Sequence, residues 1–159
     1  MKKAVLINLL IFFSISLSAQ ERPLNTGLSF DEQYAFISMT LEELIDRFGP
    51  PRAVATARGN ETWQDDVVFQ YTSVDFYLHI NRVWQVQFLT THGISHGNRK
   101  SAVLQILGDL IQSSAAQDNG DHLLIPVTGK NWPLMLRINF NSEDMTGQVT
   151  AIFLYRSDY

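Results

Sequence analysis

The 159-residue sequence contains no cysteine, so neither a disulfide framework nor a cysteine-ligated metal can stabilise the fold. It also has no run of basic residues, because only twelve Lys and Arg stand against sixteen Asp and Glu, for a net charge of −4 at pH 7. An acidic chain without basic clusters is a poor match for nucleic acid or anionic lipid. Stability must therefore come from a hydrophobic core.

Catalytic and nucleotide-binding patterns are missing as well. The sequence has no G-x-S-x-G, H-E-x-x-H, P-loop or G-x-G-x-x-G pattern. His92 and His96 have a spacing that suits a metal on a helix, but Gly93 and Gly97 argue against a helix there. Only His122 or scattered carboxylates could complete such a site. We therefore expect no metal, no cofactor and no enzymatic activity, and we interpret these histidines as solvated linker residues.

The beginning of the chain has the pattern of a secretory signal. Lys2 and Lys3 precede a mostly apolar run over residues 4–17, which is too short to span a bilayer comfortably. We predict a signal peptide over residues 1–19, with cleavage after Ser18 or Ala19; an uncleaved anchor or a buried strand is the alternative. Because no cysteine can carry a lipid anchor, we expect a soluble periplasmic or secreted protein, and a short two-lysine signal favours a bacterial source.

The next segment, residues 20–33, contains proline, asparagine and glycine without apolar periodicity, which predicts a flexible leader. A complete short helix then follows within residues 37–51. Thr40 and Glu43 have the spacing of a capping box, and Gly49 can take the left-handed conformation that ends a helix before two prolines. The predicted apolar stripe is Leu41, Leu44, Ile45 and Phe48.

Downstream of a polar, irregular stretch over residues 52–66, the apolar period changes from helical to twofold. Residues 67–71 are a short β-prone run, and residues 75–80 and 84–88 alternate as half-buried strands do. The breaks between these segments are short enough for antiparallel hairpins. The first half of the chain is thus predicted to be one helix followed by three strands.

The second half repeats this order in weaker form. Residues 97–108 place Val103 and Leu107 four apart before a glycine, with Asn98 as the expected cap and Lys100 at the position of Leu41. Residues 71–80 also align without gaps to residues 127–136, and a last strand is predicted over residues 148–155. Coincidence is the alternative, since short amphipathic helices that end in glycine are common.

The helix segment S-M-T-L-E-E-L-I-D-R-F-G-P-P resembles the G-M-T-x-x-x-V-x-x-x-L-G-x-P pattern of the SmpA/OmlA outer-membrane-assembly lipoproteins. Taken with the duplication, the chain resembles the β-lactamase-inhibitor-protein (BLIP)-like architecture. The resemblance departs at Ser38, which replaces the motif glycine, and in the missing acylated cysteine. It implies an α+β fold of two tandem α-β-β-β repeats, over residues 34–92 and 93–159, in one antiparallel sheet with helices packed on one face.

The period-two pattern divides the predicted strands into two faces. The expected core comprises Phe76, Leu78, Ile80, Trp84, Val86, Phe88, Trp132, Leu134, Leu136, Ile138, Val149, Ala151 and Phe153. The expected opposite face comprises Tyr77, His79, Gln85, Gln87, Met135, Arg137, Thr150 and Ile152. Aromatic, Met and Arg residues among amides are typical of a protein interface, although an ordinary half-solvated sheet face has a similar composition.

The leading hypothesis from the sequence is an exported, non-enzymatic module of the bacterial envelope whose exposed sheet face binds another envelope or secreted protein. The resemblance allows an envelope-assembly or an enzyme-inhibitor role. One alternative is a small-molecule-binding, metal-binding or hydrolytic periplasmic protein that uses a cleft between the repeats. A further alternative is a structural protein that self-associates through a sheet edge.

Overall fold

The computed structural model describes residues 28–58 and 66–158, so the predicted signal and residues 20–27 of the predicted leader lie outside the described residues. The helices within these ranges are α1 (Phe30–Tyr34), α2 (Leu41–Phe48), α3 (Lys100–Ile106) and α4 (Gly108–Ser113). The strands are β1 (Ala53–Ala57), β2 (Asp66–Gln70), β3 (Val74–His79), β4 (Arg82–Phe88), β5 (Thr90–Thr91), β6 (Ile94–Ser95), β7 (Gln117–Asp118), β8 (His122–Thr128), β9 (Pro133–Phe140) and β10 (Val149–Arg156).

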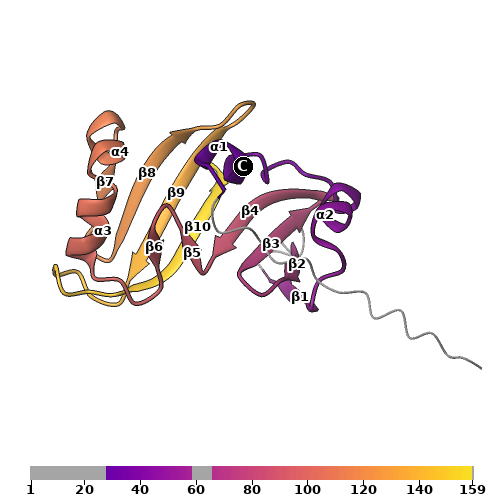
Figure 1. Cartoon of the computed structure of the whole chain (residues 1–159), viewed down its shortest axis with the longest axis horizontal. Helices are drawn as coiled ribbons and strands as arrows, with labels where there is room; N and C mark the ends of the chain where they lie inside the picture. The colour runs from indigo at the N-terminus through magenta and orange to yellow at the C-terminus, as the bar shows by residue number, and fades with distance from the viewer. Residues whose placement is uncertain (1–27, 59–65, 159) are drawn as a thin grey trace, which may run out of the picture.

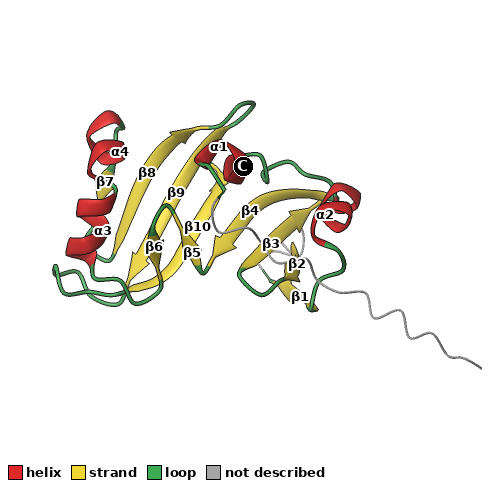
Figure 2. Cartoon of the chain, in the orientation of Figure 1, coloured by secondary structure: helices red, strands yellow, loops and turns green. Residues whose placement is uncertain are grey.

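Eight of these strands form one antiparallel sheet in the order β1-β2-β3-β4-β10-β9-β8-β7, and β5 and β6 form a separate hairpin. Figure 1 shows the sheet as a strongly twisted layer, with α2 at one end, α3 and α4 at the other, and α1 over the middle. The α+β class and the single antiparallel sheet are confirmed (Figure 2). None of the helices in the described ranges is long and apolar enough to cross a membrane.

Helix α2 forms as its local sequence predicts. The Thr40 side chain accepts from the Glu43 backbone N–H, and the Glu43 carboxylate accepts from the Thr40 N–H, which completes the capping box. Gly49 ends the helix at a φ of 77°, a conformation that costs a residue with a Cβ. Leu44 and Phe48 are buried, but Ile45 is exposed, so the apolar stripe is narrower than predicted.

Residues 28–33, the described part of the predicted flexible leader, contain the start of a short helix. Ser29 and Glu32 form a second capping box and begin α1. Buried Gln33 anchors this helix, since its Nε2 donates to the Leu28 carbonyl at 3.0 Å. The missing apolar periodicity was misleading because a five-residue helix is too short to show a stripe.

The helix predicted over residues 97–108 corresponds to α3, which differs from the prediction at both of its ends. Asn98 does not cap it, because its side chain accepts from the Ser95 N–H in the preceding turn, and Arg99 at the N-cap makes no side-chain cap bond. Gly108 does not stop it either, because α4 begins there. Lys100, the apparent mismatch at the Leu41 position, is buried at 2% exposure.

Each half of the chain supplies four strands, rather than three, to the eight-stranded sheet. The extra strand of the first half is β1, in the stretch that the sequence suggested was irregular, and the extra strand of the second half is the two-residue β7. Both lie at the edges of the sheet, where a strand pairs on one side only and carries a weaker alternating pattern.

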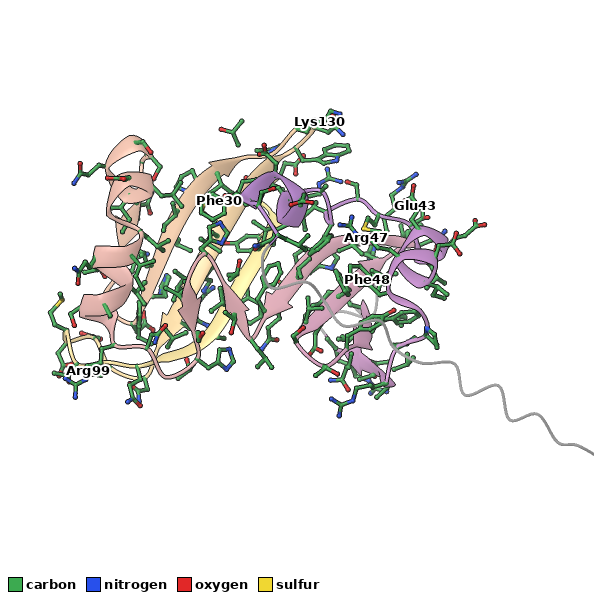
Figure 3. The ribbon with its side chains drawn as sticks, viewed as in Figure 1. Phe30, Glu43, Arg47, Phe48, Arg99 and Lys130 are labelled. Atoms are coloured by element: carbon green, nitrogen blue, oxygen red, sulfur yellow. The ribbon has the colours of Figure 1, made fainter. Side chains whose placement is uncertain are left out.

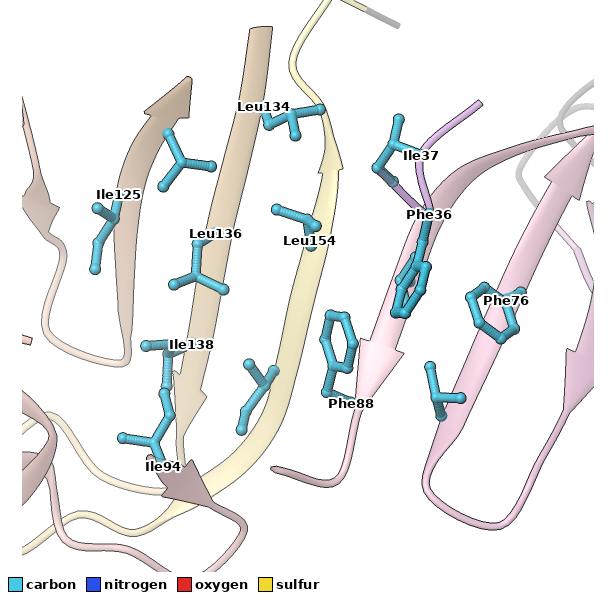
Figure 4. Packing of buried hydrophobic residues seen from close by; sticks show 14 of the residues in the cluster. Phe36, Ile37, Phe76, Phe88, Ile94, Ile125, Leu134, Leu136, Ile138 and Leu154 are labelled. Atoms are coloured by element: carbon cyan, nitrogen blue, oxygen red, sulfur yellow. The ribbon is translucent and has the colours of Figure 1, made fainter. Parts of the chain in front are cut away.

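One face of the sheet carries the core (Figure 4). The predicted core residues that are buried there are Phe76, Leu78, Val86, Phe88, Leu134, Leu136, Ile138 and Val149. Buried residues from α2, α3 and the α1–α2 connection belong to the same cluster, including Phe36, Leu44, Phe48 and Val103. The helices therefore supply the layer that an antiparallel sheet with one apolar face requires.

Two β-bulges explain most of the errors in the predicted core. A register shift between Val149 and Ala151 lets Thr150 bulge, so that Ile152 and Leu154, rather than Ala151 and Phe153, point into the core. Ile152 was predicted on the opposite face and is 0% exposed, which corrects that assignment.

A second shift, in β4, leaves Trp84 half-buried at its bulge. Ile80 is 85% exposed because it forms the β3–β4 turn with Asn81, where both residues have positive φ values of 44° and 63°. Trp132, the remaining error, lies beyond β8 in the β8–β9 turn.

Candidate functional site

The outer face of the sheet, opposite the core, brings predicted site residues together. Strand register places two adjacent rows across the four strands at the centre of the sheet, β3, β4, β10 and β9. One row is Tyr77, Gln85, Tyr155 and Met135, and the other is Asp75, Gln87, Phe153 and Arg137. We call these eight residues the outer-face patch.

Five of the eight predicted binding residues belong to this patch. They are Tyr77, Gln85, Gln87, Met135 and Arg137, all half-buried. His79 lies on the same face, two residues further along β3. Thr150 is exposed at the β10 bulge, on the margin of the patch, and Ile152 is in the core.

Phe153, Tyr155 and Asp75 belong to the patch but were not predicted. The two aromatic residues were missed because the β10 bulge reverses the alternation, and β-bulges leave no simple sequence pattern. Asp75 alternates with Phe76 and could have been found by extending the predicted outer face by one residue.

Polar contacts within and between strands hold several side chains on the outer face. The Tyr77 hydroxyl donates to Gln87 Oε1 at 2.9 Å, and Arg137 Nε donates to Asn139 Oδ1 at 2.8 Å. His79 Nδ1 lies 3.6 Å from the carboxylate of Asp66, which is largely buried. Side chains that are held in one geometry lose less conformational entropy when a partner binds.

Burial also raises the pKa of two patch residues. It raises the pKa of the Tyr77 hydroxyl, and the nearby Asp75 and Asp66 carboxylates raise it further, so Tyr77 stays neutral. Burial likewise raises the pKa of the Asp75 carboxyl, although hydrogen bonds from Gln70 and Tyr71 oppose the effect. The patch thus offers aromatic rings, amides, a thioether, one guanidinium and the Asp75 carboxyl group.

A second polar cluster lies under α1, where the structure corrects the assignment of His92 as a solvated linker residue. His92 is 9% exposed and occupies the turn between β5 and β6 with a φ of 54°. Its Nδ1 lies 2.7 Å from the Thr91 hydroxyl, and its Nε2 lies 3.3 Å from the Tyr34 hydroxyl. The Thr91 hydroxyl also bonds to Gln33, and the Phe30 ring stacks on the imidazole at 3.8 Å.

This buried chain of polar groups fastens α1 to the β5–β6 hairpin (Figure 3 labels Phe30 on α1). Burial lowers the pKa of His92 to about 4 and raises the pKa of Tyr34 to about 12, with a smaller contribution from Asp31 to the latter. Both side chains are therefore neutral at pH 7. A neutral, enclosed imidazole bonded at both nitrogens is a structural tie rather than an accessible base.

The three histidines weighed as metal ligands, His92, His96 and His122, have separate surroundings. His96 is exposed, and His122 pairs with Asp121 at 2.6 Å and contacts Asn119. Within residues 28–58 and 66–158, no three or more His, Cys, Asp or Glu side chains are placed to hold a metal ion.

A pocket of about 360 Å³ opens between α1 and the β8–β9 turn. Asp31, Tyr34 and Ile37 line one side, and residues 128–132 with Leu134 line the other. The Arg156 guanidinium stacks 3.7 Å from the Trp132 ring and holds it at the rim. None of the three histidines lines this pocket.

Comparison with known proteins places the chain in no family. No family model matches it, and no curated protein matches it. Among solved structures, the chain is similar to an extracellular protein containing an SCP domain from Bacillus anthracis str. Ames, with a TM-score of 0.49 and 12% sequence identity. The match covers 87% of this chain and 50% of the other, so the chain spans about half the length of that protein.

The resemblance to the SmpA/OmlA and BLIP-like proteins is therefore wrong: no family model of either group matches the chain, and the similar solved structure named above contains an SCP domain. The error has a physical origin. Thr40, Gly49 and Pro51, which carried the motif, are the residues that begin and end any sharply bounded amphipathic helix. They report local helix geometry rather than descent.

Proposed function

We propose that this chain is an exported, non-enzymatic protein-binding module of a bacterial envelope, and that it binds another envelope or secreted protein through the outer-face patch. The observation that carries the proposal is the alignment of Tyr77, Tyr155 and Phe153 with Met135 and Arg137 in two adjacent rows. Aromatic, Met and Arg side chains are the types enriched in protein interfaces and among their energetically dominant residues.

The electrostatics of the patch support a protein partner over a charged small ligand. One guanidinium, from Arg137, and one carboxylate, from Asp75, lie in the same row with Gln87 and Phe153 between them. Such a surface has no strong field of either sign, so recognition would rest on ring contacts and amide hydrogen bonds over several strands.

The proposal is tested by capturing partners on the immobilised protein, identifying them by mass spectrometry and repeating the binding with the purified partner. We expect Tyr155→Ala and Arg137→Ala each to weaken that binding by about tenfold or more, as hot-spot truncations do. Gln148→Ala, in the exposed turn before β10, is the matched control. Equal binding by all three variants, with unchanged thermal unfolding, would falsify the assignment of the outer face.

We also propose that the two halves of the sheet are tandem copies of one unit. Strands β1 to β4 and strands β7 to β10 each run in sequence from an edge to the centre, where β4 pairs with β10. Each half is preceded by two short helices. The sequence match of residues 71–80 to 127–136 falls at corresponding hairpins, β2–β3 and β8–β9, which supports duplication.

A second candidate function is small-molecule binding in the pocket beside α1. Its volume lies within the range of ligand sites, and it lies between an element of each half. A thermal-shift screen of small organic ligands tests this candidate: a shift that Trp132→Ala abolishes would support it, and a screen without any shift would exclude it. The metal-binding and hydrolytic versions have no such support from the described residues.

A further inference from the structure

The two edges of the eight-stranded sheet are protected unequally. At one edge, β7 is only two residues long, and its Asp118 accepts from the buried Lys100 ammonium. At the other edge, β1 has the sequence A-V-A-T-A, with no charge, proline or bulge within it. Proteins usually blunt exposed edges with such features, because unpaired backbone groups otherwise pair with another strand.

Apolar side chains beside β1 are exposed as well. Val54 is 59% exposed, and Val67 on the neighbouring strand is 43% exposed. Register places Val67 opposite Thr56, and Val54 opposite the half-buried Phe69, so these side chains share the core face of the sheet at its open end. A strand added to β1 would cover this strip and satisfy the edge backbone together.

The order of residues in β1 indicates which strand fits. The segment is nearly symmetric about Ala55, since Ala53 and Ala57 are equivalent and Val54 and Thr56 are close in shape. When two such strands pair antiparallel about Ala55, each Val54 meets Thr56 of the second copy, and alanine meets alanine on the other face. Self-complementarity of this kind is what a two-fold symmetric contact requires.

We propose that β1 is the contact edge for a second copy of this chain, joined antiparallel about Ala55 into one continuous sixteen-stranded sheet. With the two-fold axis perpendicular to the sheet, the outer-face patches of both copies lie on the same side. The contact is independent of the partner proposed above for that patch.

The flanking charges limit the strength of this contact. Arg52 and Arg58 bracket β1, and the centred register sets each Arg52 opposite Arg58 of the second copy. Like charges directly opposite each other are unfavourable, and salt screens them. The dimer is therefore weak at low ionic strength and strengthens as salt is added, and replacing one arginine by an acid converts both repulsions into attractions.

Sedimentation velocity of the purified protein from about 1 to 200 μM, a range that covers weak self-association, tests the proposal. The wild type is expected to shift from monomer to dimer with concentration. Thr56→Lys, which places a charge opposite Val54 of the second copy, is expected to weaken dimerisation at least about tenfold, and Val54→Lys does the same by a second route. Thr128→Lys, at the exposed end of β8, is the matched control.

Arg58→Glu is expected to strengthen the dimer several-fold and to reverse its salt dependence. Far-UV circular dichroism and thermal unfolding establish that each variant is folded. A wild type that stays monomeric throughout the range overturns the proposal. A dimer that neither lysine variant weakens also overturns it, because the contact would then use another surface.

Discussion

The helices at the two ends of the sheet are held in place by different interactions. At the α2 end, the helix is closed by its own side chains, with the Thr40–Glu43 box at the start and Gly49 at the stop. At the α3 end, the helix has no side-chain cap, and a buried lysine anchors it instead. Figure 3 shows Glu43 and Arg99, near the starts of these helices, at opposite ends of the molecule.

The Lys100 ammonium forms hydrogen bonds with three different segments. Lys100 Nζ donates to Asp118 Oδ1 at 2.7 Å, to the Gly120 carbonyl at 2.8 Å and to the Glu143 carbonyl at 3.3 Å. It also lies 5.5 Å from the centroid of the Phe140 ring. One ammonium thus ties α3 to β7, to the β7–β8 turn and to the β9–β10 connection. Burial tends to raise the pKa of Asp118, but hydrogen bonds from Lys100 and Gly120 lower it overall.

The residue types of the core also differ between the two ends of the sheet. Around α2 it is aromatic: Phe36 meets Phe48 at 5.5 Å and Phe76 at 5.6 Å, and Arg47 covers the Phe36 ring at 5.0 Å. On β8 and β9 it is aliphatic, built from Leu and Ile, such as Ile125. When side chains of the helix satisfy its terminal backbone N–H groups, apolar packing is enough to hold that end. When they do not, as in α3, tertiary hydrogen bonds must hold it.

The largest change in stability is expected when the buried Lys100 ammonium is removed. Lys100→Ala is expected to lower the free energy of unfolding by about 3 kcal/mol, since two carbonyls lose their donor and the stem leaves a cavity. Leu41→Ala, at the related position of α2, should cost roughly 1 kcal/mol because Leu41 is only partly buried. Urea unfolding at pH 7 measures both.

Lys100→Met separates charge from packing in the same experiment, because it keeps most of the stem and should recover about 1 kcal/mol. Equal losses for Lys100→Ala and Leu41→Ala would show that the two helices are anchored equally, against the comparison.

Acid tests the contact between α1 and the β5–β6 hairpin, which lies between the two ends of the molecule (Figure 1). The pKa of His92 falls from 6.5 to about 4 on folding, so the unfolded chain binds the proton more readily. Its contribution is complete above pH 6.5 and is lost as the pH falls through about 4, a loss on the order of 3 kcal/mol.

Because carboxylates also titrate in this range, the measured quantity is the difference between the wild type and His92→Gln in urea unfolding at pH 7 and pH 4. The wild type should lose more stability than the variant. His122→Asn, which removes a histidine outside the buried cluster, should behave like the wild type. Parallel pH profiles for the wild type and His92→Gln would refute the buried-tie interpretation.

The smallest expected effect concerns the caps themselves. Thr40→Ala should destabilise the protein by about 1 kcal/mol, because the Glu43 N–H loses its acceptor. Arg99→Ala, at the N-cap of α3, should change stability by less than about 0.5 kcal/mol, since its side chain makes no cap bond. Thermal unfolding of the two variants compares them directly, and similar shifts would remove the distinction between the helices.

The predictability of each feature follows the range of the interactions behind it. Helix α2 was predictable to its cap because Thr40, Glu43 and Gly49 act within nine residues of one another. The outer face was predictable in part, because Gln85 and Gln87 follow the β4 bulge at Trp84, and pairing with Tyr77 and Asp75 continues from there without a further shift. On β10 the alternation failed at Thr150, where the bulge is set by pairing with β9 rather than by the local sequence.

Residues that looked ordinary in the sequence show the same limit. His92 and Lys100 have no local pattern that marks them as buried, since Tyr34, Asp118 and the Glu143 carbonyl, which contact them, are far away in the chain. The adjacent Thr91, which also contacts His92, is itself bonded to the distant Gln33. Polar groups enter a core only where such distant partners satisfy them, so their burial could not be predicted before the fold was known.

The sequence by itself determined the α+β class, the capped helix α2, the period-two strands and the absence of a cysteine-based framework. Tertiary structure alone decided the phase of β10, the burial of His92 and Lys100, and the exposure of β1 at an edge. The physical reason is that caps and alternation depend on neighbours within a few residues, whereas bulges, buried charges and edges depend on which strand lies alongside.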